Sequence, residues 1–334
     1  MIKSEKLEEE EKDYKSLFSN IVLISGNSNL ALSKKISDNL NIPIANSIIS
    51  RFSDGEIRVK ILENVRGKDV FIIQSTCPPV NDNLMELLII IDAVKRASAG
   101  TITAIIPYFG YAKQEKKVSG REPITAKLVA NLLTTAGANR VVTIELHAPA
   151  IQGFFDIPVD NLQANNILIK ALKENVIIND DLSKYVVLAP DAGSVIRSRI
   201  FAEKIGVPIA VMFKRRPDIE EVESMEVVGE VKNKKVIIVD DMISTAKTLV
   251  KASEKITSLG ASEVYAVAVH PVFSSNAVKI LEESNIKKVI VTDTIPLNNE
   301  YKNSNKIIQV SVAELLSEVI KRIYLRKSIS ELFD

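Results

Sequence analysis

The chain has 334 residues, of which 46% are hydrophobic and 25% are charged, and its formal net charge is +1. This length and composition favour a soluble protein with two domains of ordinary size. The balanced charge argues against a basic surface for nucleic acid, and the single cysteine, Cys77, excludes an internal disulfide and a cysteine-based metal site. The longest apolar run, residues 87–91, is too short to span a bilayer, and residues 1–15 lack the apolar core of a signal peptide. We therefore expect a cytoplasmic protein with no nucleic-acid or membrane partner.

The first half of the chain predicts strands that alternate with helices, after a charged extension at residues 1–17. A turn followed by strict alternation at 51–61 predicts an exposed hairpin arm. The polar residues 108–121 predict a solvated loop. Pro123 suits the first turn of the helix that follows this loop. Apolar runs and helical spacing predict strands at 21–24, 42–49, 70–73, 102–107 and 141–146 and helices at 29–40, 81–98 and 123–136.

The second half repeats this rhythm, which suggests a duplicated fold whose halves join near residues 160–166. Such alternation predicts α/β domains with parallel sheets. We read His270 as a packing residue at a strand end. The predicted strands are 185–189, 209–213, 263–269, 288–291 and 307–310, and the predicted helices are 162–174, 195–205, 277–283 and 312–324.

The segment from Lys235 to Thr248 organises the second half. A buried β-branched run ends in Asp240 and Asp241, and a hydroxyl-rich turn then leads into a helix that Gly260 ends. In such a strand–loop–helix unit the helix N-terminus is a ready anion site. The acids would suit ribose hydroxyls or hydrated Mg²⁺, and the threonines of the turn would suit a phosphate. The alternative is that the two acids merely cap the helix.

This segment resembles the ribose-phosphate recognition loop of phosphoribosyltransferase-like folds. Further segments, in order from about residue 20 to the C-terminus, resemble the ribose-phosphate diphosphokinase (phosphoribosyl pyrophosphate synthase) family; they are 51–56, 81–88, 121–131, 147 with 151–160, 190–193, 214–217 and 328–333. The resemblance implies two similar phosphoribosyltransferase-like α/β domains, 18–164 and 165–310, each a mainly parallel sheet flanked by helices. It also implies that a C-terminal helix at 311–334 packs back on the first domain.

The resemblance implies transfer of the diphosphoryl group of ATP to the C1 hydroxyl of ribose 5-phosphate, with Mg²⁺ as cofactor. Phosphoryl transfer needs positive charge around the moving group, and Lys214 and Arg216 at a strand exit could supply it. These two are therefore the catalytic candidates. The other implied contacts are Phe52, Asp54, Glu56, Lys113, Gln114 and His147 for ATP, Asp240, Asp241, Ser244, Thr245, Ala246, Lys247 and Thr248 for ribose 5-phosphate, and His147 with Asp191 for Mg²⁺.

The resemblance also implies regulation by phosphate and ADP and a homo-oligomer built from dimers, with a hexamer as the expected size. In that family the arm that holds the adenine crosses to a neighbouring subunit. The implied effector residues are Arg66, Lys117, Arg121, Gln152, Asp160, Asn161, Ser328, Ser330 and Phe333.

The chain departs from the family pattern mainly around the active site. The family usually has arginine at Lys113, aspartate at Glu145, glycine at Ser194 and Lys247, and an acid at Ser244. Two interpretations remain open. The chain is a working synthase with a retuned site, or it is a catalytically impaired paralogue that binds nucleotide and regulates an active homologue. A phosphoribosyltransferase acting on a base would explain the segment 235–248, although not the two-domain pattern or the adenine arm.

Overall fold

The computed structural model describes residues 18–215, 224–298 and 304–332. The chain divides into two compact units, residues 1–162 with 313–334 and residues 163–312. Both are built from parallel sheets and helices, so the predicted α/β class is confirmed. The predicted extension at 1–17 lies outside the described residues. Among the described helices, none combines the length and apolarity that a bilayer crossing demands.

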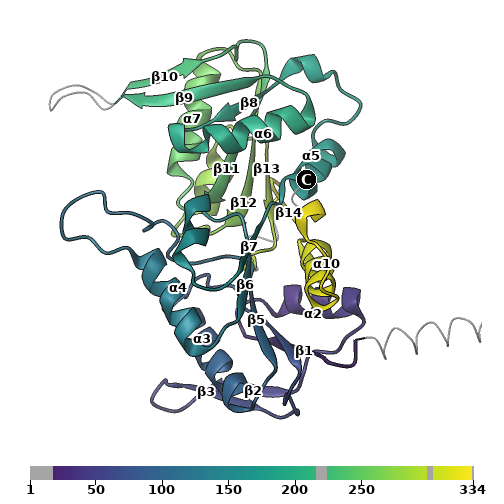
Figure 1. The fold of residues 1–334 in the computed structure, drawn as a ribbon. Coiled ribbons are helices and arrows are strands. Elements are labelled where there is room, and N and C mark those ends of the chain that lie inside the picture. The colour runs from purple at the N-terminus through teal and green to yellow at the C-terminus, as the bar shows by residue number, and fades with distance from the viewer. Residues whose placement is uncertain (1–17, 216–223, 299–303, 333–334) are drawn as a thin grey trace, which may run out of the picture. The chain divides into compact units, whose positions relative to one another are not determined.

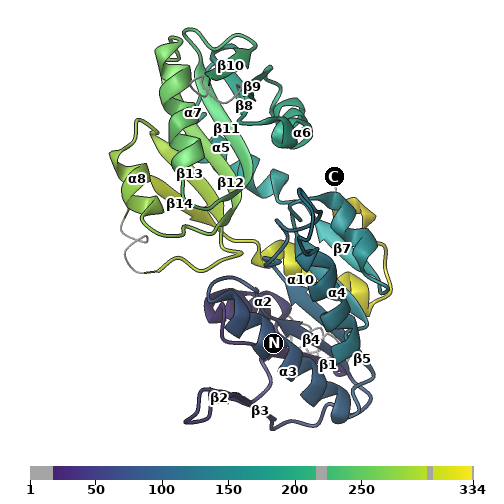
Figure 2. The same ribbon diagram turned by 90° about the vertical axis from the view of Figure 1, so that its left-hand side faces the viewer.

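The first unit contains a parallel sheet whose strands follow chain order (Figure 1). Its helices are α2 (Leu30–Leu40), α3 (Val80–Arg96) and α4 (Thr125–Ala136), of which α3 and α4 lie side by side (Figure 2). The strands are β1 (Ile21–Ser25), β4 (Asp69–Ile73), β5 (Thr101–Ile106), β6 (Arg140–Ile144) and β7 (Val159–Leu162).

Two peripheral elements complete this unit. Strands β2 (Ser47–Arg51) and β3 (Ile57–Ile61) pair antiparallel as the predicted hairpin arm, and Gly55 supplies a positive φ of 94° in its turn. The C-terminal helix α10 (Ala313–Tyr324) packs on α2, where the Ser317 hydroxyl donates to the Ile36 carbonyl at 3.5 Å. Short 3₁₀ turns lie at η1 (Pro149–Phe154) and η4 (Ser330–Leu332).

The second unit is a seven-stranded sheet in the order β10-β9-β8-β11-β12-β13-β14, parallel except for the β9–β10 pair. Its strands are β8 (Tyr185–Ala189), β9 (Ile209–Arg215), β10 (Ser224–Val228), β11 (Lys235–Ile243), β12 (Glu263–Pro271), β13 (Lys288–Thr292) and β14 (Ile307–Val310). Its helices are α5 (Asn165–Asn175), α6 (Val195–Ile205), α7 (Lys247–Ser258) and α8 (Ala277–Glu283), with 3₁₀ turns η2 (Leu182–Lys184) and η3 (Ala192–Ser194).

The central strands of this sheet are buried because both faces are covered, as their continuous Val and Ile runs predict. Gly206 and Gly260 follow α6 and α7 with φ of 88° and 93°, the left-handed conformation that ends helices. His270 is buried in β12, with Nδ1 at 2.9 Å from the Thr294 hydroxyl, and thus packs as predicted.

Several predicted boundaries were wrong. The strands β7 and β10 were not predicted, and β7 occupies the start of the helix expected at 162–174. Pro123 precedes α4 instead of lying in its first turn. Strand β9 continues through Arg215, so Lys214 lies inside a strand, paired with Met225, and not after its end. Strand β11 likewise continues past its two acids to Ile243.

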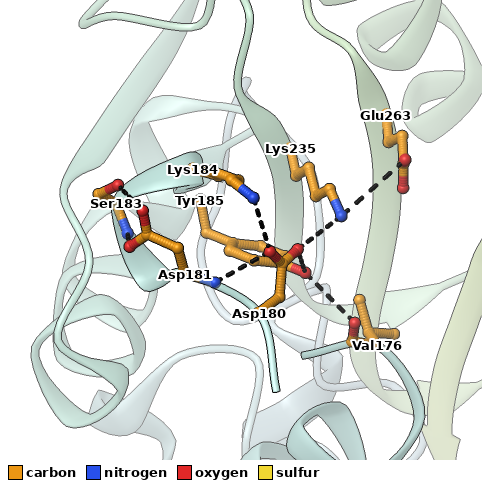
Figure 3. A network of polar contacts seen from close by, with 8 residues as sticks. All are labelled: Val176, Asp180, Asp181, Ser183, Lys184, Tyr185, Lys235 and Glu263. Atoms are coloured by element: carbon orange, nitrogen blue, oxygen red, sulfur yellow. Dashed lines mark hydrogen bonds and ion pairs between the residues drawn. The ribbon is translucent and has the colours of Figure 1, made fainter. Parts of the chain in front are cut away.

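An ion-pair network fixes the amino-terminal edge of this sheet (Figure 3). The Asp180 carboxylate accepts from Lys235 Nζ at 2.7 Å, from Lys184 Nζ at 3.0 Å and from the Tyr185 hydroxyl at 3.0 Å. These hydrogen bonds hold the pKa of Asp180 well below its usual range, with that from Lys235 the largest cause. Because Tyr185 begins β8 and Lys235 begins β11, the network ties the first residues of two neighbouring strands together.

Candidate functional site

The two acids of β11 lie next to each other near the carboxyl end of the strand. Asp240 Oδ1 accepts from the Asp241 N–H at 2.9 Å. Asp241 is only 3% exposed, and a guanidinium nitrogen of Arg197 from α6 lies 3.9 Å from its Oδ1. Burial, reinforced by the charge of Asp241, raises the pKa of Asp240 to about 8. The strand therefore presents a carboxyl group that holds its proton unless a cation or a hydrogen-bond donor compensates the charge.

The loop after β11 leads directly into the N-terminus of α7. Ala246, the residue before the helix, has φ 61° and ψ −9°, and its side chain makes no capping hydrogen bond. The first N–H groups of a helix have no partner within it, so the start of α7 offers donors to an anion. Thr245, Lys247 and Thr248 are exposed around these donors. Two hydroxyls, a cation and helix N–H groups together suit a phosphate.

The left-handed residue in this loop is Ala246, one position before the lysine that replaces the usual glycine. Lys247 is the first residue of α7 and does not have a positive φ. The backbone at Lys247 therefore does not need a glycine, and the exposed lysine side chain adds a positive charge beside the helix start.

Asp191 lies at the same edge of the sheet, because β8 and β11 are parallel neighbours. Its Oδ1 accepts from the Ser194 N–H at 2.9 Å, and the Ser194 hydroxyl donates to the Asp191 carbonyl at 2.8 Å. Ser194, where the family pattern has glycine, thus fixes the turn that carries Asp191. The structure brings Asp191 close enough for its charge to contribute to the raised pKa of Asp240.

The two predicted catalytic cations lie at or beyond the end of β9. Lys214 is the penultimate residue of that strand, whose parallel neighbour is β8. Its backbone therefore lies at the same edge as Asp191 and Asp240. Arg216 lies outside the described residues.

The predicted adenine contacts lie in the turn of the β2–β3 arm. Phe52 is 50% exposed, and the Arg58 guanidinium lies 5.8 Å from the centroid of its ring. The Phe52 N–H donates to the Glu56 carbonyl at 2.8 Å, and Asp54 Oδ1 accepts from the Glu56 N–H at 3.1 Å. The turn is therefore ordered internally while it presents an aromatic ring and two carboxylates to solvent.

The other predicted ATP contacts follow β5 and β6 in the first unit. Lys113, Gln114 and His147 are exposed at the carboxyl edge of the parallel sheet. The Gln114 carbonyl accepts from the Ala126 N–H at 3.2 Å, which ties the segment after β5 to the first turn of α4. Glu145, just before His147, has a positive φ of 47° and bends the chain there.

The predicted effector residues differ in exposure, and several of them make hydrogen bonds within the chain. Asp160 pairs with Arg140 at 2.5 Å, and Asn161 Oδ1 accepts from the Leu146 N–H at 2.9 Å. The Ser328 and Ser330 hydroxyls are 3.1 Å apart, and Phe333 lies outside the described residues. The remaining members are exposed; they are Arg66, Lys117, Arg121 and Gln152.

Within the described ranges, no three His, Cys, Asp or Glu side chains gather in a way that could hold a metal ion by themselves. Magnesium, however, commonly uses one or two protein ligands and completes its shell with water and substrate phosphates. In the second unit Asp191 has one carboxylate oxygen engaged by Ser194, and in the first unit His147 is exposed; carboxylate oxygen suits Mg²⁺ better than imidazole nitrogen does.

Comparison with known proteins identifies the family. Residues 21–137 match the model of the N-terminal domain of ribose phosphate pyrophosphokinase, and residues 216–334 match that of the phosphoribosyl synthetase-associated domain. The chain is 54% identical over 311 residues to a ribose-phosphate pyrophosphokinase of Caldanaerobacter subterraneus subsp. tengcongensis, covering 93% of this chain and 97% of the relative. The chain belongs to the ribose-phosphate pyrophosphokinase family.

Two further ribose-phosphate pyrophosphokinase relatives agree with this assignment. That of Fusobacterium nucleatum is 50% identical over 317 residues, with 95% of this chain and 99% of the relative covered. The crystal structure of phosphoribosylpyrophosphate synthetase from Mycobacterium smegmatis superposes with a TM-score of 0.86 at 40% identity and covers 92% of this chain and 99% of that one. The ribose-phosphate pyrophosphokinase family predicted from the sequence is confirmed.

The sequence analysis missed two residues that contact the site at the end of β11. Arg197, beside Asp241, carried a weak signal, a cation in the helix that follows the strand-end acid Asp191. Ser274 contacts Ser244 across a separation of 30 positions. The sequence around Ser274 contains no pattern that predicts this contact.

Proposed function

We propose that this chain is a working ribose-phosphate pyrophosphokinase, which transfers the diphosphoryl group of ATP to the C1 hydroxyl of ribose 5-phosphate and releases AMP. The observation that carries the proposal is the start of α7, which has no side-chain cap and follows a strand bearing two acids. An acid pair for sugar hydroxyls and an open helix N-terminus for a phosphate are what a pentose phosphate requires.

In this proposal Asp240 and Asp241 accept hydrogen bonds from the ribose hydroxyls, and residues 244–248 hold the 5-phosphate. The charge of the bound phosphate, close to the helix start, is stabilised by the helix dipole and by Lys247. The Arg197 guanidinium, 3.9 Å from Asp241, places a positive charge beside that carboxylate and helps to hold it in position.

The diphosphoryl transfer is assigned to the cations Lys214 and Arg216, which would neutralise charge that builds on the leaving AMP and the moving group. ATP is assigned to Phe52, Asp54, Glu56, Lys113, Gln114 and His147. The arm at Phe52 stacks on the adenine, and its carboxylates accept from the exocyclic amine. Lys113 keeps a positive charge where the family usually has arginine, without the bidentate fork.

We assign Mg²⁺ to His147 and Asp191, whose imidazole nitrogen and carboxylate oxygen are possible ligand atoms, with substrate phosphates as further ligands. The ion would supply charge neutralisation on the phosphates when bound. The finer features of the proposal are a cytoplasmic enzyme with two phosphoribosyltransferase-like domains and a homo-oligomer built from dimers, of hexameric size. Its effector response would use the residues named above.

The test is the formation of AMP by the purified full chain with ATP, ribose 5-phosphate and Mg²⁺, each omitted in turn. The proposal expects AMP only in the complete mixture, and far less with an Asp240→Ala, Lys214→Ala double variant. Turnover no greater than that of the double variant would refute it.

A second candidate is a nucleotide-binding regulatory subunit, which the departures Ser244 and Lys247 favour because both lie in the pentose-phosphate loop. It predicts that the chain is inactive alone, copurifies with an active homologue and changes the kinetics of the mixture. Activity of the isolated chain, with no homologue present, would exclude it.

A further inference from the structure

Two loops meet at the carboxyl ends of β11 and β12. The loop at 244–246 follows β11, and residues 272–276 follow β12. The N–H groups of Phe273 and Ser274 donate to the Ile243 and Ser244 carbonyls at 3.0 and 3.1 Å. The Ser244 and Ser274 hydroxyl oxygens lie 3.0 Å apart. Two backbone bonds and one side-chain bond therefore join the two loops.

The second loop is held in an unusual backbone conformation. Phe273 has φ 41° and Ser275 has φ 57°, and a positive φ is unfavourable for a bulky side chain. Phe273 is nonetheless 5% exposed and packs in the core that also contains Ile243 and Ala246. The buried ring anchors the loop under the pentose-phosphate loop. Strain of this kind persists where the surrounding structure imposes it, and it clusters at functional sites.

Ser244, one member of the hydroxyl pair, stands where the family pattern has an acid. Both serines are half-buried, so the pair is supported from below and open to a ligand. A carboxylate can only accept hydrogen bonds, whereas two bonded hydroxyls share one proton between them and leave one proton and further lone pairs for a ligand. The pair can therefore both donate to and accept from a sugar hydroxyl.

We propose that Ser274 is a further positioning residue of the pentose-phosphate site, which orients the Ser244 hydroxyl so that the pair replaces the missing carboxylate in binding a ribose hydroxyl. This inference rests on the proposed function. In the alternative, Ser274 only helps to join the two loops. The two backbone hydrogen bonds already join them, and a side-chain substitution leaves these bonds intact.

The test uses the full chain and measures KM for each substrate. Ser274→Ala should raise KM for ribose 5-phosphate about 10-fold, the loss expected for one hydrogen bond of about 1.4 kcal/mol, while KM for ATP and kcat stay within about two-fold. Ser244→Ala should behave alike, and the double variant should be no worse than the more affected single one, because both remove the same pair. Ser274→Thr keeps a hydroxyl and should restore most of the affinity.

The matched control is Ser258→Ala, which removes a hydroxyl at the other end of α7, where it donates to the Lys255 carbonyl. It should leave both KM values unchanged. A KM for ribose 5-phosphate within about two-fold of wild type in Ser274→Ala, or an equal rise for ATP, would overturn the inference.

Calorimetric titration of ribose 5-phosphate separates this inference from the proposed function. If the chain forms no AMP but binds the sugar phosphate about 10-fold less tightly after Ser274→Ala, the proposed activity fails and the inference stands. If the wild-type chain binds no ribose 5-phosphate, or the variant binds it equally well, the inference fails.

Discussion

Glu86→Gln in α3 probes how the first unit holds the loops at the carboxyl edge of its sheet. The Glu86 side chain is buried, with 8% exposure of the residue, and three donors converge on it. Its Oε1 accepts from the Asn27 N–H at 2.7 Å and from Gln74 Nε2 at 2.8 Å, and its Oε2 accepts from Asn27 Nδ2 at 2.8 Å. Asn27 follows β1 and Gln74 follows β4, so one carboxylate joins two strand-end loops.

The expected cost follows from counting donors and acceptors. Glutamine has one acceptor oxygen and an NH₂ group, so at least one of the three donors must face another donor. Losing one charge-assisted hydrogen bond of this buried carboxylate, and placing an NH₂ group against its former donor, should destabilise the first unit by about 2 kcal/mol. Thermal or urea unfolding, with native-state hydrogen exchange of the Asn27 amide to assign the loss to this loop, measures it.

The matched control is Glu63→Gln. Glu63 Oε1 alone accepts both from the Asn46 N–H at 2.7 Å and from Asn46 Nδ2 at 3.0 Å, at an exposed position. A glutamine oxygen can keep both bonds, so the change should cost less than about 0.5 kcal/mol. Equal stability of the two variants would refute the reasoning, because the buried carboxylate would then contribute no more than the exposed one.

Three other substitutions test the second unit. Because burial raises the pKa of Asp240 to about 8, the folded chain binds this proton more tightly than the unfolded chain, and stability is lost as pH rises from about 4 to about 8. Without added metal, Asp240→Asn should therefore melt above wild type near pH 8.5 and level with it near pH 4, and an equal difference at both would contradict this. Asp180 is the opposite case: its lowered pKa gives stability that is present above its unfolded pKa and lost as pH falls, so Asp180→Asn should lower the melting temperature at neutral pH and progressively less below about pH 4. Ala246→Gly relieves a φ of 61° and should raise the free energy of unfolding by up to about 1 kcal/mol, whereas a loss of that size would show that the methyl group packs favourably.

The sequence predicted those helices and strands whose bounds are determined by the local pattern of apolar residues. The prediction gave the exact bounds of one strand and one helix, Tyr185–Ala189 and Val195–Ile205. The apolar run of the strand and the helical spacing of apolar residues in the helix each have clear ends. The strand carrying Asp240 and Asp241 was found, although the acids were expected to end it. They do not, because β12 continues alongside and pairs with Met242 and Ile243.

The sequence could not predict what depends on contacts between distant segments. Strand β7 is four residues long and forms by pairing with β6, and β10 forms by pairing with β9. Such short strands are defined by their partners more than by their own residues. The bond between Ser244 and Ser274 likewise depends on two parallel strands placing their following loops together.

The most direct test of the central claim follows the phosphorus atoms of ATP during turnover by the purified chain with ribose 5-phosphate and Mg²⁺. The account predicts that AMP and a diphosphate ester at C1 of the pentose accumulate in equal amounts, because the β- and γ-phosphates move together. Formation of ADP and a singly phosphorylated product, or no consumption of ATP, would contradict it.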